Sequence, residues 1–548
     1  MQRKSADTLA RMLVTLLAMA GGGVIGFAVT LAIVVAKARA GAYIFALEDL
    51  LAFRWETAPI AIGLVLGILI GHRHPNAIDR ATVWGLATML LGVGCGILIG
   101  SLWWGEGEGQ WAGGIIFGAT GLAAGGTASL WLQRGRIDVR LLAGVRGALM
   151  LLAFALLVTV GLTNLIRVDP LELQPSHRVP VPHAEDVDAV VFLLGDAGAI
   201  DEKRSPLLYA LAADVEWWSR SLARDSAVSI VFLGDVVYPE GVHERTHPAF
   251  PTDSARLWNQ IGLVGGPDAT RHATIGLFLA GNHDWGNTTG DAGMDRISNL
   301  NEQLLTARRV GYEVSLLPPP GQPGPIARDL RSNARIVFLD THWFLQDRST
   351  QAREEFFAHV EEVLRNAGER AVVFVAHHPY ISAGPHGVLV PGYHTGGIAF
   401  LLKKSGTLVQ DLNSSVYSDF LARMRQTFVK SEKPPLIFAG GHDHSLQVLI
   451  GTEPFDPPFS LVSGAGSKLS SIRMTDGLIW GAAQPGYMML AFRKNGAVDL
   501  FAIAADEDYL ACSVSDAELA QCMADGTRSF RIQYSRSLLQ GNSHRGAR

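Results

Sequence analysis

The feature that most constrains this sequence is an apolar run that ends in Gly-Asp and then recurs. Residues 190–196 read VVFLLGD, and residues 229–235 read SIVFLGD. Apolar, partly β-branched runs that stop at glycine are typical of buried strands. Ligands bind at the carboxyl ends of strands in open α/β sheets, so the runs would deliver two carboxylates there, Asp196 and Asp235. A single Gly-Asp pair is more often an ordinary turn, so the interpretation depends on the residues further along the chain.

Three later strand-like runs also end in metal-binding residue types: TIGLFLAGNHD, AVVFVAHHP and PLIFAGGHDH. Each group alone has an ordinary explanation as a turn, a capped loop or solvated histidines, but five in succession are improbable by chance. In chain order, the polar residues at or just after the five strand ends are Asp196, Asp235, Tyr238, Asn282, His283, Asp284, His377, His378, His386, His442 and His444.

Carboxylate, phenolate, amide oxygen and imidazole together suit Fe, Mn or Zn. The absence of a thiolate disfavours a structural zinc site, and Cys95, Cys512 and Cys522 form no zinc-type cluster. A carboxylate shared by two ions about 3.5–4 Å apart would create a centre that activates water and neutralises charge on a phosphoryl group.

The order of motifs GDxG, GDxxY, GNHD, HxP and GHxH resembles the purple acid phosphatases within the calcineurin-like metallophosphoesterases, especially the small tartrate-resistant enzymes. The resemblance covers residues 187–505 and extends to GGHDHSLQ and LVSGAGSK. Most of that superfamily has DxH as its first motif, whereas Gly198 stands at the histidine position here. Together with Tyr238, this departure marks the purple branch, in which a tyrosinate binds ferric iron.

The resemblance implies two metal ions, Fe(III) and a divalent Fe, Zn or Mn. The implied ligands are Asp196, Asp235, Tyr238 and His444 for Fe(III), and Asp235, Asn282, His377 and His442 for the divalent ion, with Asp235 bridging. His377 is preferred because the family ligand stands two residues before the proline, here Pro379. His378 is then either a neighbouring structural histidine or an alternative ligand.

The resemblance also implies the catalytic residues. His283 and His386 match histidines that contact the substrate and protonate the leaving oxygen, which suits an imidazole because its pKa lies near operating pH. Asp284 would orient His283. The spacing from His386 to His442 is longer than expected for small family members, and the extra segment, around Gly392–Phe420, forms either a lid or a surface insertion.

The implied activity is hydrolysis of phosphate monoesters by a metal-bound hydroxide. A phosphodiesterase or pyrophosphatase acting on nucleotide or lipid-linked phosphates is the alternative, because the same two-metal chemistry serves both reactions. A sensor or scaffold with a degenerate phosphatase fold is a third possibility, but no ligand of the set is missing. The formal net charge of −5 gives no reason to expect nucleic acid as a partner.

The order of segments predicts an α/β fold in residues 188–505. Early strands alternate with helices and the last strands follow one another directly, which indicates two packed sheets flanked by helices, an α/β sandwich. The predicted helices are Ser205–Ala223, Thr350–Asn366 and Ser415–Thr427, and the predicted strands are AVVFLLG, SIVFLG, TIGLFLAG, ARIVFLD, AVVFVAH, PLIFAG, FSLVSG, YMMLAF and AVDLFAI.

Residues 1–167 predict an all-α transmembrane domain. The apolar runs are Met12–Val35, Ala58–Gly71, Ala81–Trp104, Ala112–Leu132 and Leu141–Ile166. Most reach the roughly 20 residues that a spanning helix needs. The second run is short, and it is either a span or a re-entrant or interfacial segment. A proline-rich linker (168–187) would precede the α/β domain, and a C-terminal tail of uncertain structure (506–548) would follow it.

Loop charges predict the orientation of the chain. Eight basic residues flank the spans on one side and four on the other, so the N-terminus is expected in the cytoplasm. Five crossings would place the catalytic domain outside, on the periplasmic side of a bacterial inner membrane, with the lipid bilayer as a partner. An oxidising compartment would permit a disulfide between Cys512 and Cys522, the alternative being two free thiols.

Overall fold

The computed structural model describes residues 171–172, 179–505 and 530–540, except for short gaps at 200–205, 223–226, 267–273, 289–290, 332, 347, 388–411 and 471. The described residues belong to one compact unit formed by 168–388 and 409–548. No helix among them is long and apolar enough to cross a membrane. The five predicted spans, the three cysteines and most of the segment 392–420 lie outside the described residues.

Two mixed sheets form the centre of this unit. The seven-stranded sheet has the spatial order β15 (Phe530–Leu539), β14 (Val498–Ala505), β13 (Gly486–Arg493), β2 (Val187–Leu194), β3 (Val228–Phe232), β4 (Ile275–Phe278) and β5 (Val314–Leu316). Strands β2 to β5 are parallel, and β13 joins β2 antiparallel with Met488 opposite Leu193. The predicted Gly-Asp strands are therefore neighbours, with Leu194 of β2 opposite Phe232 of β3.

The second sheet has eight strands. Its order is β1 (Leu171–Glu172), β12 (Leu478–Ala482), β10 (Leu446–Ile450), β11 (Phe459–Ser463), β9 (Ile437–Gly440), β8 (Ala371–Val375), β7 (Ala334–Phe338) and β6 (Ile326–Leu330). Strands β7, β8, β9 and β11 are parallel to one another, so β8 and β9 end at the same edge of the sheet.

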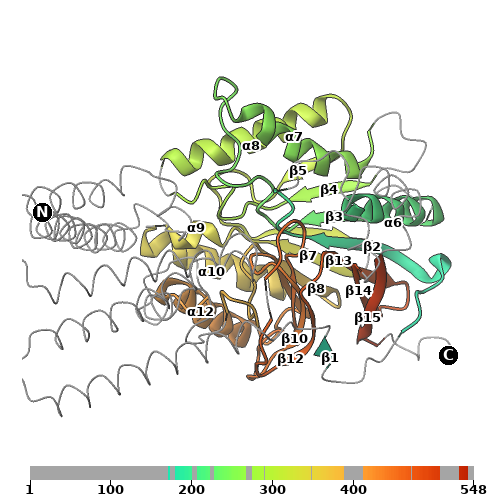
Figure 1. Cartoon of the computed structure of the whole chain (residues 1–548). Helices are drawn as coiled ribbons and strands as arrows, with labels where there is room; N and C mark the ends of the chain where they lie inside the picture. The colour runs from blue at the N-terminus through green and yellow to red at the C-terminus, as the bar shows by residue number, and fades with distance from the viewer. Residues whose placement is uncertain are drawn as a thin grey trace, which may run out of the picture. The chain divides into compact units, whose positions relative to one another are not determined.

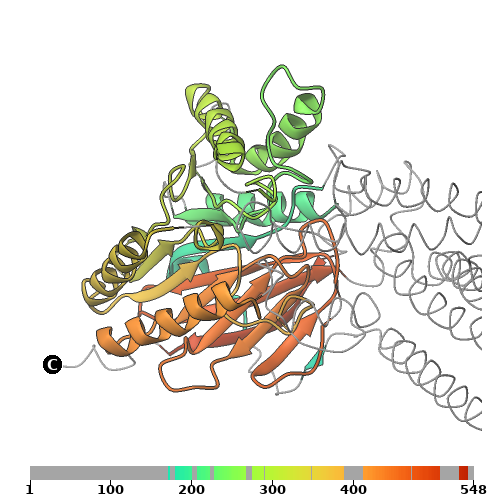
Figure 2. The same cartoon turned by 90° about the vertical axis from the view of Figure 1, so that its left-hand side faces the viewer.

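Helices cover the outer faces of the paired sheets. The described helices are α6 (Pro206–Leu222), α7 (Phe250–Ile261), α8 (Asp291–Arg309), α9 (His342–Leu345), α10 (Thr350–Arg365) and α12 (Ser415–Ser431), with short 3-10 turns η3 (Ala184–Asp186) and η4 (Gly262–Val264). Figures 1 and 2 show α7 and α8 on one side of the sheets and α10 and α12 on the other. Helices α10 and α12 each begin at a serine, Ser349 and Ser414, whose side chain accepts a backbone N–H of the first turn.

Strand β2 shows why its sequence is apolar from Ala189 onwards. Val190, Phe192 and Leu194 pack in the core beneath helices α6 to α8. Val191 and Leu193 point the other way, into the core between the two sheets. Side chains alternate along a strand, so a strand buried on both faces needs no polar position. The two-sheet α/β sandwich predicted from the sequence is confirmed.

All nine predicted strand runs and all three predicted helices are present. The sheets also recruit segments from outside the predicted 188–505 domain. β1 lies in the proline-rich linker and pairs with β12, and β15 lies in the C-terminal tail and pairs with β14 along its whole length.

Candidate metal centre

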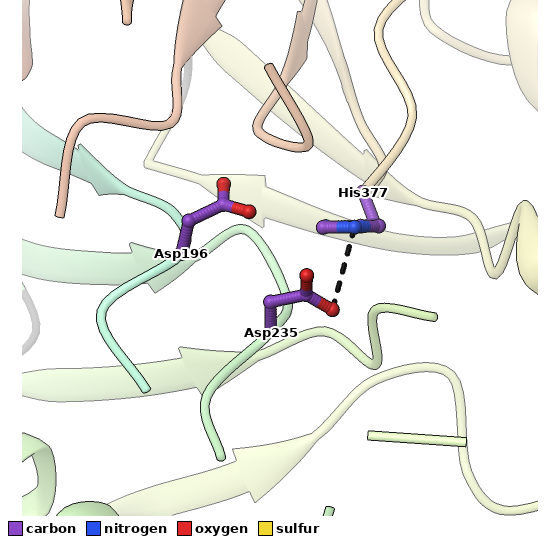
Figure 3. Close-up of side chains that lie close together, drawn as sticks. All are labelled: Asp196, Asp235 and His377. Carbon is purple, nitrogen blue, oxygen red and sulfur yellow. Dashed lines mark ion pairs between the residues drawn. The ribbon is translucent and has the colours of Figure 1, made fainter. Parts of the chain in front are cut away.

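The five predicted strand ends meet at one edge of the sandwich, where the two sheets face each other. Asp196 follows β2, Asp235 and Tyr238 follow β3, and Asn282 follows β4, all from the seven-stranded sheet. The second sheet contributes residues after β8 and β9: His377, His386, His442 and His444. Figure 3 shows Asp196, Asp235 and His377 brought together from three strands. One ligand atom from each of these three lies within 4.8 Å of the other two, so the group could hold a metal ion.

The backbone at the centre is held in an uncommon conformation. Asp196, Asp235 and His442 have φ values of 59°, 53° and 66°, in the left-handed region that non-glycine residues seldom adopt. Such strain persists only where surrounding contacts enforce it, and it is found at functional sites. The neighbouring glycines permit the close approach of these loops. A Cβ on Gly281 would lie 2.1 Å from Asp235 Oδ1, and one on Gly198 would lie 2.5 Å from the Val237 nitrogen.

One group of donor atoms surrounds His377 Nε2. Asn282 Oδ1 lies 2.8 Å from it, His442 Nδ1 3.3 Å and Asp235 Oδ1 3.4 Å. His442 Nδ1 is also 3.2 Å from Asn282 Oδ1. All four residues are buried. This is the set that the sequence predicted for the divalent ion.

The hydrogen bonds around this group leave a set of donor atoms that suits a cation. His377 Nδ1 donates to the carbonyl oxygen of Leu233 at 2.9 Å, and burial lowers the pKa of His377, so Nε2 carries a lone pair. Asn282 Nδ2 donates to Asn287 Oδ1 at 2.9 Å, which points Asn282 Oδ1 inward. Three acceptor atoms, from His377, Asn282 and Asp235, therefore converge beside His442 Nδ1. A positive ion removes the repulsion among these acceptors, so the donor set fits a metal.

A second group of donor atoms surrounds the hydroxyl of Tyr238. The hydroxyl donates to Asp196 Oδ1 at 3.0 Å and lies 3.2 Å from His444 Nε2. His444 Nε2 is 3.5 Å from the same Asp196 oxygen. This is the predicted Fe(III) set apart from the shared Asp235. The structure thus brings together all seven residues that the sequence singled out as ligands.

The pKa values show how much negative charge is concentrated here. Burial and the nearby Asp235 raise the pKa of Asp196 well above its usual range. Burial, together with Asp196 and Asp235, raises the pKa of Tyr238 in the same way. Burial opposes ionisation of Asp235 too, but His377 and His283 outweigh it, so the pKa of Asp235 is lowered. Asp235, the predicted bridge, is therefore the acid most readily ionised before any ion binds.

The two predicted acid–base histidines lie beside the ligand groups and are partly exposed. The ring of His283 lies 4.4 Å from the ring of Tyr238 (centroid to centroid), and its Nδ1 donates to the carbonyl oxygen of Pro239 at 2.6 Å. The ring of His386 lies 4.2 Å from that of His442. Each donor set therefore has one partly exposed imidazole next to it.

Asp284 has a different role from the one expected. Its carboxylate accepts the backbone N–H groups of Val236 (3.2 Å), Val237 (3.0 Å) and Gly281 (2.8 Å). These bonds tie the Asp235 loop to the Asn282 loop. His283 is oriented by the Pro239 carbonyl instead, so the prediction that Asp284 orients His283 is corrected. The reason is local, because three unpaired amides converge on the buried carboxylate.

His378 packs against the first donor group, with its ring 4.3 Å from that of His442 and 5.0 Å from that of His377, but its polar contacts lie elsewhere. The hydroxyl of Thr341 lies 2.8 Å from His378 Nδ1, and the backbone N–H of His378 donates to the same hydroxyl at 3.2 Å. The hydroxyl of Tyr417 contacts the His378 carbonyl oxygen at 3.1 Å. These contacts fix the loop after β8 and favour the structural alternative for His378.

Two residues near the centre were not singled out from the sequence. Asp443, between two predicted ligands, bonds to the loop that carries His386. Lys468 places its Nζ 3.8 Å from the centroid of the Tyr238 ring. The motif LVSGAGSK contained Lys468, but nothing in the spacing indicated that its side chain reaches Tyr238.

Comparisons with known proteins give only distant likenesses. No family model matches the sequence, and no curated protein matches it. Among solved structures, the chain is similar to GAP50, described as the anchor in the inner membrane complex of Plasmodium (14% identity, TM-score 0.39, 65% of this chain and 90% of that one). It is also similar to purple acid phosphatase PPD1 from yellow lupin (14% identity, TM-score 0.39, 64% and 53%) and to PhoD (11% identity, TM-score 0.38, 60% and 68%). These likenesses are too distant to assign a function.

Proposed function

We propose that this protein is a metal-dependent phosphoesterase that hydrolyses phosphate monoesters at the centre described above. The observation that carries the proposal is the pair of donor groups, one around His377 Nε2 and one around the Tyr238 hydroxyl. The carboxylate of Asp235 lies close to a member of each group, because it is grouped with both His377 and Asp196. We assign Fe(III) to Asp196, Asp235, Tyr238 and His444, and a divalent ion to Asp235, Asn282, His377 and His442. When bound, two such ions would supply an activated water and neutralise charge on the phosphoryl group.

The remaining chemistry belongs to the chain itself. His283 and His386 are partly exposed and adjacent to the donor groups, so they can contact a phosphate ester and move a proton to the leaving oxygen. The Pro239 carbonyl fixes the His283 tautomer, because Nδ1 must carry the proton that it donates. Nε2 of His283 is then the atom that takes up a proton, and once protonated it can donate a hydrogen bond to a substrate oxygen.

The test is an assay of the full-length, metal-loaded protein against phosphate monoesters, diesters and pyrophosphates. We expect the highest kcat/KM on monoesters, and Asp235→Asn should abolish the activity. A clear preference for diesters or pyrophosphates would favour the alternative activity on nucleotide or lipid-linked phosphates. Absence of hydrolysis of every ester by protein that retains two ions would refute the proposal.

We also propose that the chain is anchored in the inner membrane of a bacterium, with the catalytic domain on the periplasmic side. This rests on the sequence alone, on its five apolar runs and its unequal loop charges. Protease added to cells with only the outer layer opened should digest the chain after Ile166. Protection of that region until the cells are lysed would place the domain in the cytoplasm.

A further inference from the structure

The loop after β11 is attached to two of the three loops that carry the Tyr238 group of donors, the loop of Asp196 and the loop of His444. Its sequence, residues 464–470, is GAGSKLS. On one side, the Gly466 N–H donates to the Gly195 carbonyl oxygen at 3.1 Å, and the Ser467 hydroxyl donates to the Asp196 carbonyl oxygen. On the other side, the Ser470 N–H donates to the His444 carbonyl oxygen at 2.8 Å. Lys468 lies between these attachments, so its position is fixed relative to the centre.

The charge of the Lys468 ammonium group acts on residues of the metal centre. Its Nζ is 3.8 Å from the Tyr238 ring centroid, and His283 contacts the same ring. After burial, the charge of Lys468 is the next cause that lowers the pKa of His444, which falls to about 3. It also favours the ionised form of Asp196. Within the part of the chain that the structure describes, no carboxylate oxygen lies within ion-pairing distance of Lys468.

A structural role for this charge is a weak explanation. A cation over an aromatic ring contributes modestly to stability, and an uncharged residue packed on the ring would partly replace that contribution. A fixed positive charge beside a metal centre also opposes cation binding. The same charge is favourable if the site receives an anion, because it then attracts the ligand and not the metal. Lys468 is only partly buried, so its ammonium can reach such a ligand.

We propose that Lys468 is a phosphate-binding residue of this site, whose ammonium bonds to a phosphoryl oxygen on the Tyr238 side of the centre. The proposal rests on the proposed function for the identity of the anion. Neither the sequence motifs nor the expected ligand set assigns a role to Lys468. Together with His283, it would place two donor side chains around the ring of Tyr238.

The test measures binding of inorganic phosphate to the full-length, metal-loaded protein by calorimetry, with metal content determined on the same samples. Lys468→Met keeps the length of the side chain but removes its charge. We expect its phosphate affinity to fall by about 10- to 100-fold, the range for a hydrogen bond to a charged group, with metal content unchanged. Lys468→Arg should stay within about fivefold of the wild type, because it retains a cationic donor. Added salt should weaken phosphate binding by the wild type more than by Lys468→Met.

The matched control is Lys494→Met, which removes an exposed lysine directly after the last residue of β13. That end pairs with Val187 at the start of β2, whereas Asp196 follows the end of β2, so Lys494 lies a strand length from the centre. We expect Lys494→Met to bind phosphate as the wild type does. Phosphate affinity of Lys468→Met within about twofold of the wild type, or loss of metal in both Lys468 variants, would overturn the proposal.

The readout separates this inference from the proposed function, because phosphate binding does not require turnover. If the wild type hydrolyses no phosphate ester but Lys468→Met still loses phosphate affinity, the proposed function fails and the binding residue stands. If the wild type hydrolyses monoesters and Lys468→Met binds phosphate normally, the reverse holds.

Discussion

The carboxylate of Asp443 accepts a hydrogen bond from the backbone N–H of His386 at 3.0 Å, although the two residues are 57 positions apart. Its other oxygen accepts the hydroxyl of Ser382 at 2.5 Å. Asp443 is fully buried between His442 and His444. It therefore connects the loop that carries two predicted ligands to the loop that carries the predicted acid.

This connection predicts that Asp443 acts through His386. In Asp443→Asn the new amide group can accept only one of the two bonds, so the His386 loop should loosen and kcat should fall by about tenfold or more, the equivalent of one lost charged hydrogen bond. Metal content should be retained. In a His386→Ala background the same substitution should have little further effect on kcat, because the group it positions is gone.

The control for this cycle is Ser382→Ala, which removes the hydroxyl but leaves the bond between Asp443 and the His386 N–H. It should lower kcat less than Asp443→Asn does. Losses of kcat that multiply in the double variant would show that Asp443 supports the centre independently of His386.

Asp235 is predicted to control the binding of both ions. It is the one carboxylate assigned to both ligand sets, and its Oδ1 also accepts the backbone N–H of His283 at 2.9 Å. Asp235→Asn removes a charge from both ions at once, so both occupancies should fall together. Metal analysis of the purified variant checks this. Asn282→Ala is the comparison, because it should deplete only the divalent ion, and full occupancy in Asp235→Asn would contradict the bridging assignment.

Tyr238 is predicted to lose its proton when ferric iron binds. Burial and two aspartates raise the pKa of its hydroxyl, so the metal-free protein holds a neutral phenol that donates to Asp196. Ferric loading should therefore release a proton, which calorimetry in buffers of different ionisation enthalpy detects. The loaded wild type should absorb visible light through the tyrosinate, and Tyr238→Phe should lack both the band and that proton. A colourless wild type with verified Fe(III) would favour Zn or Mn at this site.

Much of this site was predictable because its signals are local. A strand buried on both faces has to be apolar, and the residue after its terminal glycine necessarily falls at the sheet edge, so Asp196 and Asp235 could be located from the letters alone. Edge strands have no such signature. β6 is largely exposed, and buried and exposed residues alternate irregularly along β15. Both strands are held by backbone pairing, which their side-chain patterns do not indicate.

The contacts that position the site were not predictable, because they join distant segments. The run ARIVFLD ends in an acid just as the ligand strands do, yet Asp340 accepts the indole N–H of Trp285 at 3.0 Å instead of joining the donor groups. Asp284 lies within the GNHD motif but serves backbone amides. In each case the role of a buried carboxylate, as a possible metal ligand or as a hydrogen-bond acceptor, depends on which N–H groups lie near it. That arrangement exists only in the folded chain.

Asp340 leads to a prediction about stability. Burial raises its pKa to about 7, and its two oxygens accept the indole N–H of Trp285 and the backbone N–H of Trp343 (3.1 Å). In the unfolded chain the pKa would be near 3.8. The folded state therefore binds this proton more tightly, and the stability that Asp340 contributes is fully present below about pH 4 and lost as pH rises through about 7. Asp340→Asn removes this titration.

The measurement is the free energy of unfolding in urea at pH 5 and pH 8 for the full-length wild type and Asp340→Asn. Between these values the wild type should lose about 3 kcal/mol more than the variant, since two pH units below the folded pKa contribute about 1.4 kcal/mol each. Metal ligands that titrate in the same window are present in both proteins, so their contribution cancels in the comparison. Equal losses in the two proteins would mean that Asp340 is already ionised at pH 5, held so by the N–H groups of Trp285 and Trp343.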